Sequence, residues 1–170
     1  NLGKWQDAVK YLKEYSPADD EMVGPAAIGA LGDAYAHVNQ LDDAVSCFKK
    51  AAKHADSEAA DGTNNSFSPT YLLKAGKILE SQGKADEAEA LLKQAIALNS
   101  KAINAYNNLA NLYKGQNRFA EAKQMFDQVL SLNPNYVGAL GGAVHCAVRS
   151  CAWEKRSEQI QAISERIKQS

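Results

Sequence analysis

Apolar and small residues recur along the chain with spacings that predict paired amphipathic helices. The clearest copy covers residues 103–136, where spacings of three and four residues place each set of side chains on one stripe of a helix. The first stripe comprises Tyr106, Leu109, Ala110 and Tyr113; after a turn at 115–117, the second comprises Phe119, Ala122, Phe126 and Val129. Ala110 and Ala122 lie where two antiparallel helices would cross, because larger side chains there would hold the backbones apart. Pro134 ends the second helix.

The same helix pair occurs more than once. Full units begin at Pro25 and Pro69, 44 residues apart, and the next begins at Ile103, 34 residues after Pro69. We therefore predict repeats over 25–58, 69–102 and 103–136. The additional length falls in residues 56–67, which are rich in Gly, Asn, Ser and Asp and predict an inserted, exposed loop. This loop could touch a ligand, but a simple connection is the preferred interpretation.

Both ends of the chain predict incomplete units. Residues 3–15 have the spacing of a second helix with no first helix before it, so the segment is a cap or, as we prefer, the remainder of a repeat in a longer protein. Residues 137–170 predict a degenerate capping repeat. The side chains that would lack a partner at the start are Trp5, Ala8, Val9 and Leu12. The last unit keeps the first-helix pattern at Leu140, Ala143, Val144 and Ala147, and an apolar stripe at Ile160, Ile163 and Ile167.

The order of aromatic residue, Leu-Ala, Tyr, turn, aromatic residue, Ala, Phe and Pro over about 34 residues resembles the tetratricopeptide repeat, abbreviated TPR. This resemblance implies an all-α fold, a right-handed α-solenoid of antiparallel helix pairs. A single array would cover residues 1–170, with about four repeats after the N-terminal half repeat or cap helix. In that arrangement the first helices line a concave groove, and the family's usual function is non-catalytic protein–protein interaction.

First-helix positions not used in packing would face this groove and bind an extended peptide or partner segment. Four asparagines on one helical face are unexpected, because Asn is a poor helix former, and their amides can pair with a peptide backbone. The basic residues would favour acidic side chains or a C-terminal carboxylate, although each position could also be merely solvated. The candidate partner-binding residues are Asp33, His37, Lys74, Lys77, Asn104, Asn107, Asn108, Asn111, Lys114, His145 and Arg149. Gly29 and Gly142 fall at equivalent groove positions.

Two subfamilies allow a finer comparison. The carboxylate clamp of chaperone-binding repeats is not present, since its candidate positions hold Gly29, Asp33 and Leu73. The second half is similar to the last repeats of O-linked N-acetylglucosamine transferase, in Asn108 and in the stretches 144–146 and 151–153. The alternative functions are therefore the substrate-recognition arm of a larger glycosyltransferase, or a structural module that self-associates through the N-terminal helix.

Composition and residue spacing argue against other classes of function. The 19 basic and 20 acidic residues nearly balance, so neither nucleic acid nor an anionic membrane is expected as a partner. No apolar run approaches the roughly 20 residues that a membrane span needs, and three cysteines, an odd number, favour a reducing compartment such as the cytoplasm. His37, His54 and His145 fall in different helices without a paired acid or nucleophile, so we expect no enzyme and no cofactor. Residues 145, 146 and 151 would point in different directions, so we expect no metal site.

Overall fold

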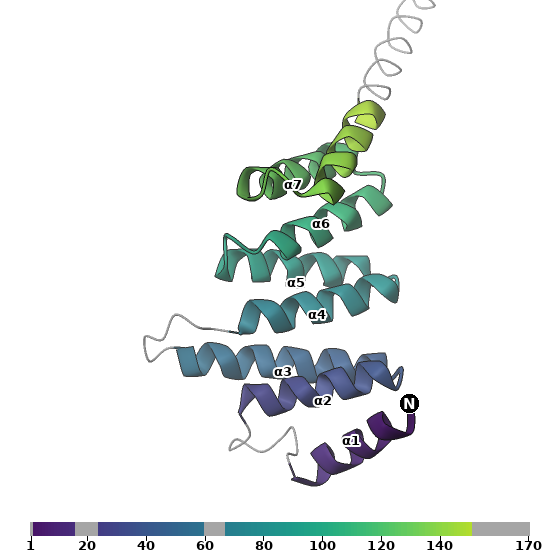
Figure 1. The fold of residues 1–170 in the computed structure, drawn as a ribbon, viewed down its shortest axis with the longest axis vertical. Helices are drawn as coiled ribbons and strands as arrows, with labels where there is room; N and C mark the ends of the chain where they lie inside the picture. Colours follow the sequence, from purple (N-terminus) through teal and green to yellow (C-terminus); the bar gives the residue numbers. More distant parts are fainter. Residues whose placement is uncertain (1, 16–23, 60–66, 151–170) are drawn as a thin grey trace, which may run out of the picture. The chain divides into compact units, whose positions relative to one another are not determined.

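The computed structural model of the chain describes residues 2–15, 24–59 and 67–150 (Figure 1). All regular secondary structure in these residues is α-helical, which confirms the predicted fold class. The helices are α1 (Leu2–Tyr15), α2 (Pro25–His37), α3 (Leu41–Ala59), α4 (Ser68–Ser81), α5 (Ala85–Leu98), α6 (Ile103–Gly115) and α7 (Phe119–Leu132), and residues 137–150 form a further helix. No helix among them is long and apolar enough to cross a membrane. The predicted apolar stripe at 160–167 lies outside the described residues.

In the three helix pairs that the structure describes completely, the turn contains one residue in the left-handed conformation. Asn39, Gly83 and Asn117 have φ angles of 63°, 74° and 61°, and they occupy equivalent positions in the three central repeats. The residue after each one donates its backbone N–H, at 2.9 Å, to a carbonyl near the end of the first helix. These bonds are Gln40 to Tyr35, Lys84 to Leu79 and Arg118 to Tyr113. This six-to-one closure satisfies the last carbonyls of the helix and reverses the chain.

The chain divides into two compact units, residues 1–105 and residues 106–170. In the first unit, each helix from α1 to α5 contacts the next one in sequence. Ala52, Leu72, Ala95 and Ala105 form a buried cluster in which residues from α3 to the start of α6 meet. Small residues keep the helices close, since a Cβ at Gly32 would lie 2.8 Å from the Phe48 ring. The predicted stripes are buried here: Ile28, Leu31 and Tyr35; Leu72, Ala75 and Leu79; Ala88, Leu92 and Ala95.

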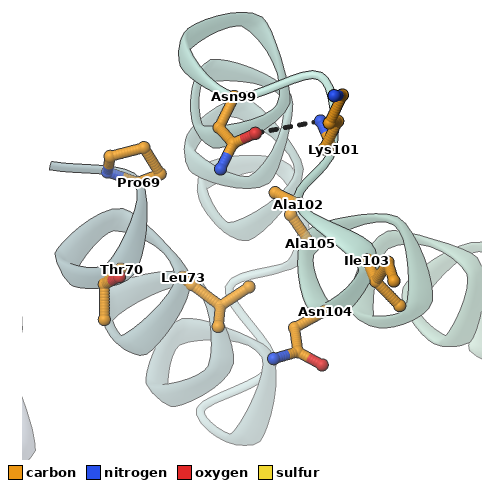
Figure 2. Close-up of a pocket in the computed structure, with 9 residues that line it drawn as sticks. All are labelled: Pro69, Thr70, Leu73, Asn99, Lys101, Ala102, Ile103, Asn104 and Ala105. Atoms are coloured by element: carbon orange, nitrogen blue, oxygen red, sulfur yellow. Dashed lines mark hydrogen bonds between the residues drawn. The ribbon is translucent and has the colours of Figure 1, made fainter. Parts of the chain in front are cut away.

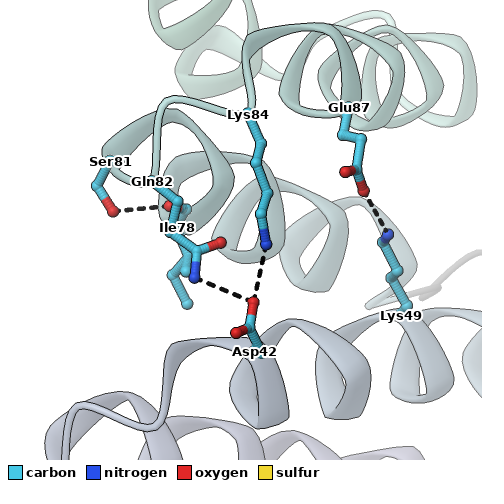
Figure 3. Close-up of polar contacts among 7 residues, drawn as sticks. All are labelled: Asp42, Lys49, Ile78, Ser81, Gln82, Lys84 and Glu87. Carbon is cyan, nitrogen blue, oxygen red and sulfur yellow. Dashed lines mark hydrogen bonds and ion pairs between the residues drawn. The ribbon is translucent and has the colours of Figure 1, made fainter.

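Ion pairs connect successive repeats within the first unit. Lys74 of α4 forms an ion pair with Asp33 of α2. Lys84 pairs with Asp42 at the start of α3 at 2.9 Å, and Lys49 of α3 pairs with Glu87 of α5 at 3.4 Å (Figure 3). Gln82 also donates to Asp42, and these hydrogen bonds, with the Lys84 bond the stronger influence, lower the pKa of the Asp42 carboxyl. Side-chain bridges therefore join α2 to α4, and join α3 to α5 and to the turn before it.

In the second unit, most of the predicted stripes of α6 and α7 are also buried: Leu109, Ala110 and Tyr113; Ala122, Phe126 and Val129. Tyr106 and Phe119, the first residue of each stripe, are half-buried. Helix 137–150 buries only part of the predicted stripe, with Ala143 buried and Ala147 half-buried. Leu140 and Val144 are 49% and 60% exposed, whereas Ala139, Gly142, Ala143 and Cys146 are buried. The reason is steric, because the large Phe126 ring of α7 lies against Gly142 and needs a face of small residues. The partner helix expected for Leu140 and Val144 falls in 151–170, outside the described residues.

Two other predictions need correction. Helix α3 continues to Ala59, so residues 56–59, assigned to the inserted loop, are helical. Ala51, Ala52 and Ala55 are buried along this longer helix, so packing extends it beyond what the polar composition of its end suggests. Residues 60–66 of the predicted loop lie outside the described residues. Trp5 of α1 does have a partner within the chain, since its ring stacks on His37 of α2 with the centroids 4.0 Å apart.

Candidate partner-binding surface

Two of the predicted groove residues, Asp33 and Lys74, bind each other. The Lys74 ammonium donates to both carboxylate oxygens of Asp33 at 2.7 Å, and it lies 5.3 Å from the Phe48 ring centroid. The two side chains are 43% and 38% exposed, so the pair stays open to solvent. A ligand carboxylate that reached Lys74 would have to compete with Asp33.

Gly29, which the sequence pattern places at a groove position, is covered by a side chain of the next repeat. Gly29 of α2 is buried, and a Cβ there would overlap the ring of Tyr71 from α4. The Tyr71 ring also stacks near Phe48, with the centroids 6.4 Å apart. The prediction that Gly29 faces the groove is therefore wrong, because Tyr71 occupies the space that a missing side chain leaves. The signal that sequence reasoning missed is a glycine on one first helix matched by an aromatic residue on the next.

The asparagines of α6 divide into two groups. The Asn111 amide nitrogen donates to the Asn107 backbone carbonyl at 3.0 Å, and the Lys114 ammonium donates to the Asn111 oxygen at 2.9 Å. Asn111 and Lys114 are thus held within their own helix, with Lys114 also 5.8 Å from the Phe126 ring. Within the described part of the chain, the Asn107 and Asn108 amides are not held in this way, and both side chains are half-buried.

The two candidates on helix 137–150 share one aromatic partner. The His145 ring meets the Phe119 ring edge-on, with centroids 6.1 Å apart, and the Arg149 guanidinium lies 5.2 Å from the same ring. Both side chains are exposed, one helical turn apart. Phe119 of α7, which sequence reasoning treated as a packing residue, therefore positions two polar groups at the surface.

On α4, Lys77 is exposed and lies near Glu80. Partial burial raises the pKa of the Glu80 carboxyl, and the Lys77 charge opposes that rise. Lys77 is therefore accessible to a ligand, although the Glu80 carboxyl lies near it. His37 is also exposed, although the Trp5 ring covers one of its faces.

A pocket of about 320 Å³ lies in the first unit, where α4 begins, α5 ends and α6 begins (Figure 2). Its lining residues are Pro69, Thr70, Leu73, Asn99, Lys101, Ala102, Ile103, Asn104 and Ala105. Asn99 accepts the Lys101 backbone N–H at 2.9 Å, which braces the connection between α5 and α6. Of these residues, the sequence pattern predicts Asn104 for binding and places Leu73 at a candidate clamp position. The pocket itself was not predicted, because it forms only where the start of α4, the α5–α6 connection and the start of α6 come together.

Neither thiols nor acidic clusters form a metal site in the described ranges. No group of three His, Cys, Asp or Glu side chains converges among residues 2–15, 24–59 and 67–150. The Cys47 and Cys146 side chains are buried, and burial raises the pKa of the Cys146 thiol. Cys151 lies outside the described residues.

Comparison with known proteins supports the repeat interpretation. Family models of the tetratricopeptide repeat match residues 25–101 and residues 79–140, which together cover most of the chain. A search of curated protein sequences returns no match. The resemblance of the second half to O-linked N-acetylglucosamine transferase is not shown by these matches, and residues 151–153, which contribute to it, lie outside the described residues.

Solved structures of similar fold include two of MamA. A crystal structure of MamA protein aligns with a TM-score of 0.69 and 17% identity, over 94% of this chain and 80% of that chain. MamA 41-end from Desulfovibrio magneticus RS-1 aligns with a TM-score of 0.68 and 21% identity, over 96% of this chain and 85% of that chain. The first TPR of Spaghetti (RPAP3), bound to the HSP90 peptide SRMEEVD, aligns with a TM-score of 0.63 and 20% identity, over 75% of this chain and 93% of that chain. At these identities the likeness shows the fold alone.

Proposed function

Because the chain belongs to the tetratricopeptide repeat family, a family of protein-interaction modules, we propose that it binds an extended segment of a partner protein along the exposed side of its first helices. The observation that carries this proposal is the pair of asparagines on α6, Asn107 and Asn108. Both residues are half-buried, and their amides are not held by the hydrogen bonds that hold Asn111. Each amide offers two donors and an acceptor, which suits a peptide backbone whose side chains need not be read.

Other observations support a peptide ligand. The first TPR of RPAP3, which has a similar fold, is described as bound to a peptide of HSP90. The polar side chains Lys77, His145 and Arg149 are exposed on helices of the same class. No catalytic domain is identified among the family matches. Asp33, Lys74, Asn111 and Lys114 have partners of their own and would contribute to binding only by exchanging them.

The test is partner capture by a double variant. Pull-down from native lysate with mass spectrometry would first identify the partner, and binding of the purified partner would then be measured by calorimetry. Asn107→Ala with Asn108→Ala should weaken binding at least tenfold, while circular dichroism and melting stay close to those of the wild type. The matched control is Gln124→Ala with Gln128→Ala, which removes two exposed amides from α7. Equal affinity of the double variant and the control would refute the groove assignment.

Two alternatives make different predictions. As the recognition arm of a glycosyltransferase, the chain would use Asn108 in the same way, but the parent gene would encode a catalytic domain downstream. As a self-associating module, the chain would use α1, where Trp5 and Tyr11 are 38% and 61% exposed. Light scattering at rising protein concentration tests that alternative. The cytoplasmic compartment stays a prediction.

A further inference from the structure

We propose that the pocket beside Leu73 receives one aliphatic side chain of the bound segment, and that Lys101 pairs with a carboxylate next to it. This inference rests on the proposed function and specifies the chemistry of the ligand. The pocket volume of about 320 Å³ is at the low end of the roughly 300–1,000 Å³ found for ligand sites. The space therefore suits a side chain or two of a peptide and not a large cofactor.

One part of the pocket wall is apolar and is supported by the core. Leu73 and Ala102 both pack against the buried cluster of Ala52, Leu72, Ala95 and Ala105. Pro69 and Ile103 add further hydrocarbon surface. A wall that is already packed against the core loses little conformational entropy on binding, so an aliphatic side chain would gain part of its transfer free energy in this open pocket.

The rim is polar and offers hydrogen-bond donors. Figure 2 shows the amide nitrogen of Asn99 on the pocket side of the connection, because its oxygen is turned to the Lys101 backbone N–H. The Asn104 amide stands across the pocket, near Leu73, and Thr70 adds a hydroxyl at the edge of α4. These groups lie on both sides of the apolar space. They can bond to the peptide carbonyls that flank an inserted side chain.

The charge of the lining selects among peptides. Of the nine residues drawn in Figure 2, Lys101 is basic and none is acidic. The first turns of α4 and α6 also contain no acidic residue, and the amino ends of helices favour negative charge nearby. A carboxylate beside the aliphatic side chain therefore fits this pocket better than an ammonium group.

The ligand can be defined with a library of phage-displayed random heptapeptides, selected on the full chain. We expect the enriched peptides to place Leu, Ile, Val or Met next to Asp or Glu. The best peptide would be synthesised with a fluorescent label and its affinity measured by fluorescence polarisation. Replacing its aliphatic residue with Ala should weaken binding at least tenfold, and replacing its acid with Gln should weaken binding about threefold to tenfold. An amidated and a free-acid form of the Gln peptide would show whether a C-terminal carboxylate supplies the same charge.

Variants of the chain then locate the binding site. Thr70→Tyr places a ring over the pocket from an exposed position, and Lys101→Glu reverses the charge of the pocket lining. Each variant should bind the peptide at least tenfold more weakly than the wild type. Ala26→Tyr, at the equivalent exposed position of α2, and Lys53→Glu on α3 are the matched controls and should bind like the wild type. Circular dichroism of each variant reports whether it remains folded.

The outcomes separate this inference from the proposed function. If Thr70→Tyr and Lys101→Glu bind normally while Asn107→Ala with Asn108→Ala does not, the pocket assignment is overturned and peptide binding stands. Enriched peptides without an aliphatic residue, or with basic residues in place of acids, would also overturn the pocket assignment. If no peptide is enriched on the wild-type chain, both proposals fail.

Discussion

The Lys74 ammonium of α4 lies 2.7 Å from each carboxylate oxygen of Asp33 of α2, although the two residues are 41 positions apart in the chain. This two-pronged ion pair joins the first helices of two successive repeats. It also gives an acidic partner to Lys74, one of the basic groups that the sequence pattern assigned to ligand binding, while both side chains stay partly exposed.

The energy of this ion pair should be small. Both side chains are more than a third exposed, and exposed pairs contribute about 0.2–1 kcal/mol. A double-mutant cycle with Asp33→Ala and Lys74→Ala, measured by urea denaturation, should give a coupling energy in that range that falls as salt is added. A coupling above about 2 kcal/mol would mean that the pair is a main structural link between the repeats.

Adjacent glycines in helix 137–150 should respond oppositely to alanine. A Cβ at Gly142 would overlap the Phe126 ring, whereas a Cβ at Gly141 would meet nothing within 4 Å. Gly142→Ala should therefore lower the free energy of unfolding by about 1–3 kcal/mol, and Gly141→Ala should raise it by about 0.5–1 kcal/mol through helix propensity. Chemical denaturation of both variants measures the difference. Equal changes in the free energy of unfolding for the two variants would mean that the Phe126 ring does not pack against Gly142.

The left-handed turn residue Asn117 should prefer glycine over alanine. Its φ of 61° costs an ordinary residue about 1–2 kcal/mol, and the Arg118 N–H bond to the Tyr113 carbonyl depends on this conformation. Asn117→Ala should lower the melting temperature by several degrees, while Asn117→Gly should leave it unchanged or raise it. Gln116→Ala, at the preceding turn position, is the control. A melting temperature for Asn117→Ala that matches this control would argue against the turn geometry.

The Glu80 carboxyl should make stability depend on pH in an unusual direction. Partial burial raises its pKa in the folded chain above the ordinary value of 4.5. The folded state therefore binds the proton more tightly than the unfolded state, and this group favours folding at low pH. Its contribution is lost as pH rises from 4.5 through the folded pKa. Melting curves should show Glu80→Gln more stable than the wild type at pH 7, and the gap should close below about pH 4. A stability difference between Glu80→Gln and the wild type that does not change with pH would contradict a raised pKa for Glu80.

Local patterns in the sequence were sufficient for the helices and their buried faces. The stripes on α4 to α7 follow from spacings of three and four residues, because each helix has the same period wherever it lies. The small residues at helix crossings, such as Ala88 and Ala122, were also evident, since they recur at repeat intervals. The last repeat was predicted less well. The small residues of helix 137–150 were visible in the sequence. The sequence did not show that the Phe126 ring would pack against Gly142 and so select the buried face of this helix.

The surface that we assign to binding could be outlined from the sequence but not resolved. The period placed Asn107 and Asn108 on an open stripe, yet it could not show that Asn111 bonds to its own helix or that Tyr71 covers Gly29. The pocket beside Leu73 was likewise invisible. Helical period is a property of a single segment, whereas a groove, an ion pair or a pocket depends on the distance between segments. Those distances are set by how side chains from different helices pack, and this information exists only when the chain is folded.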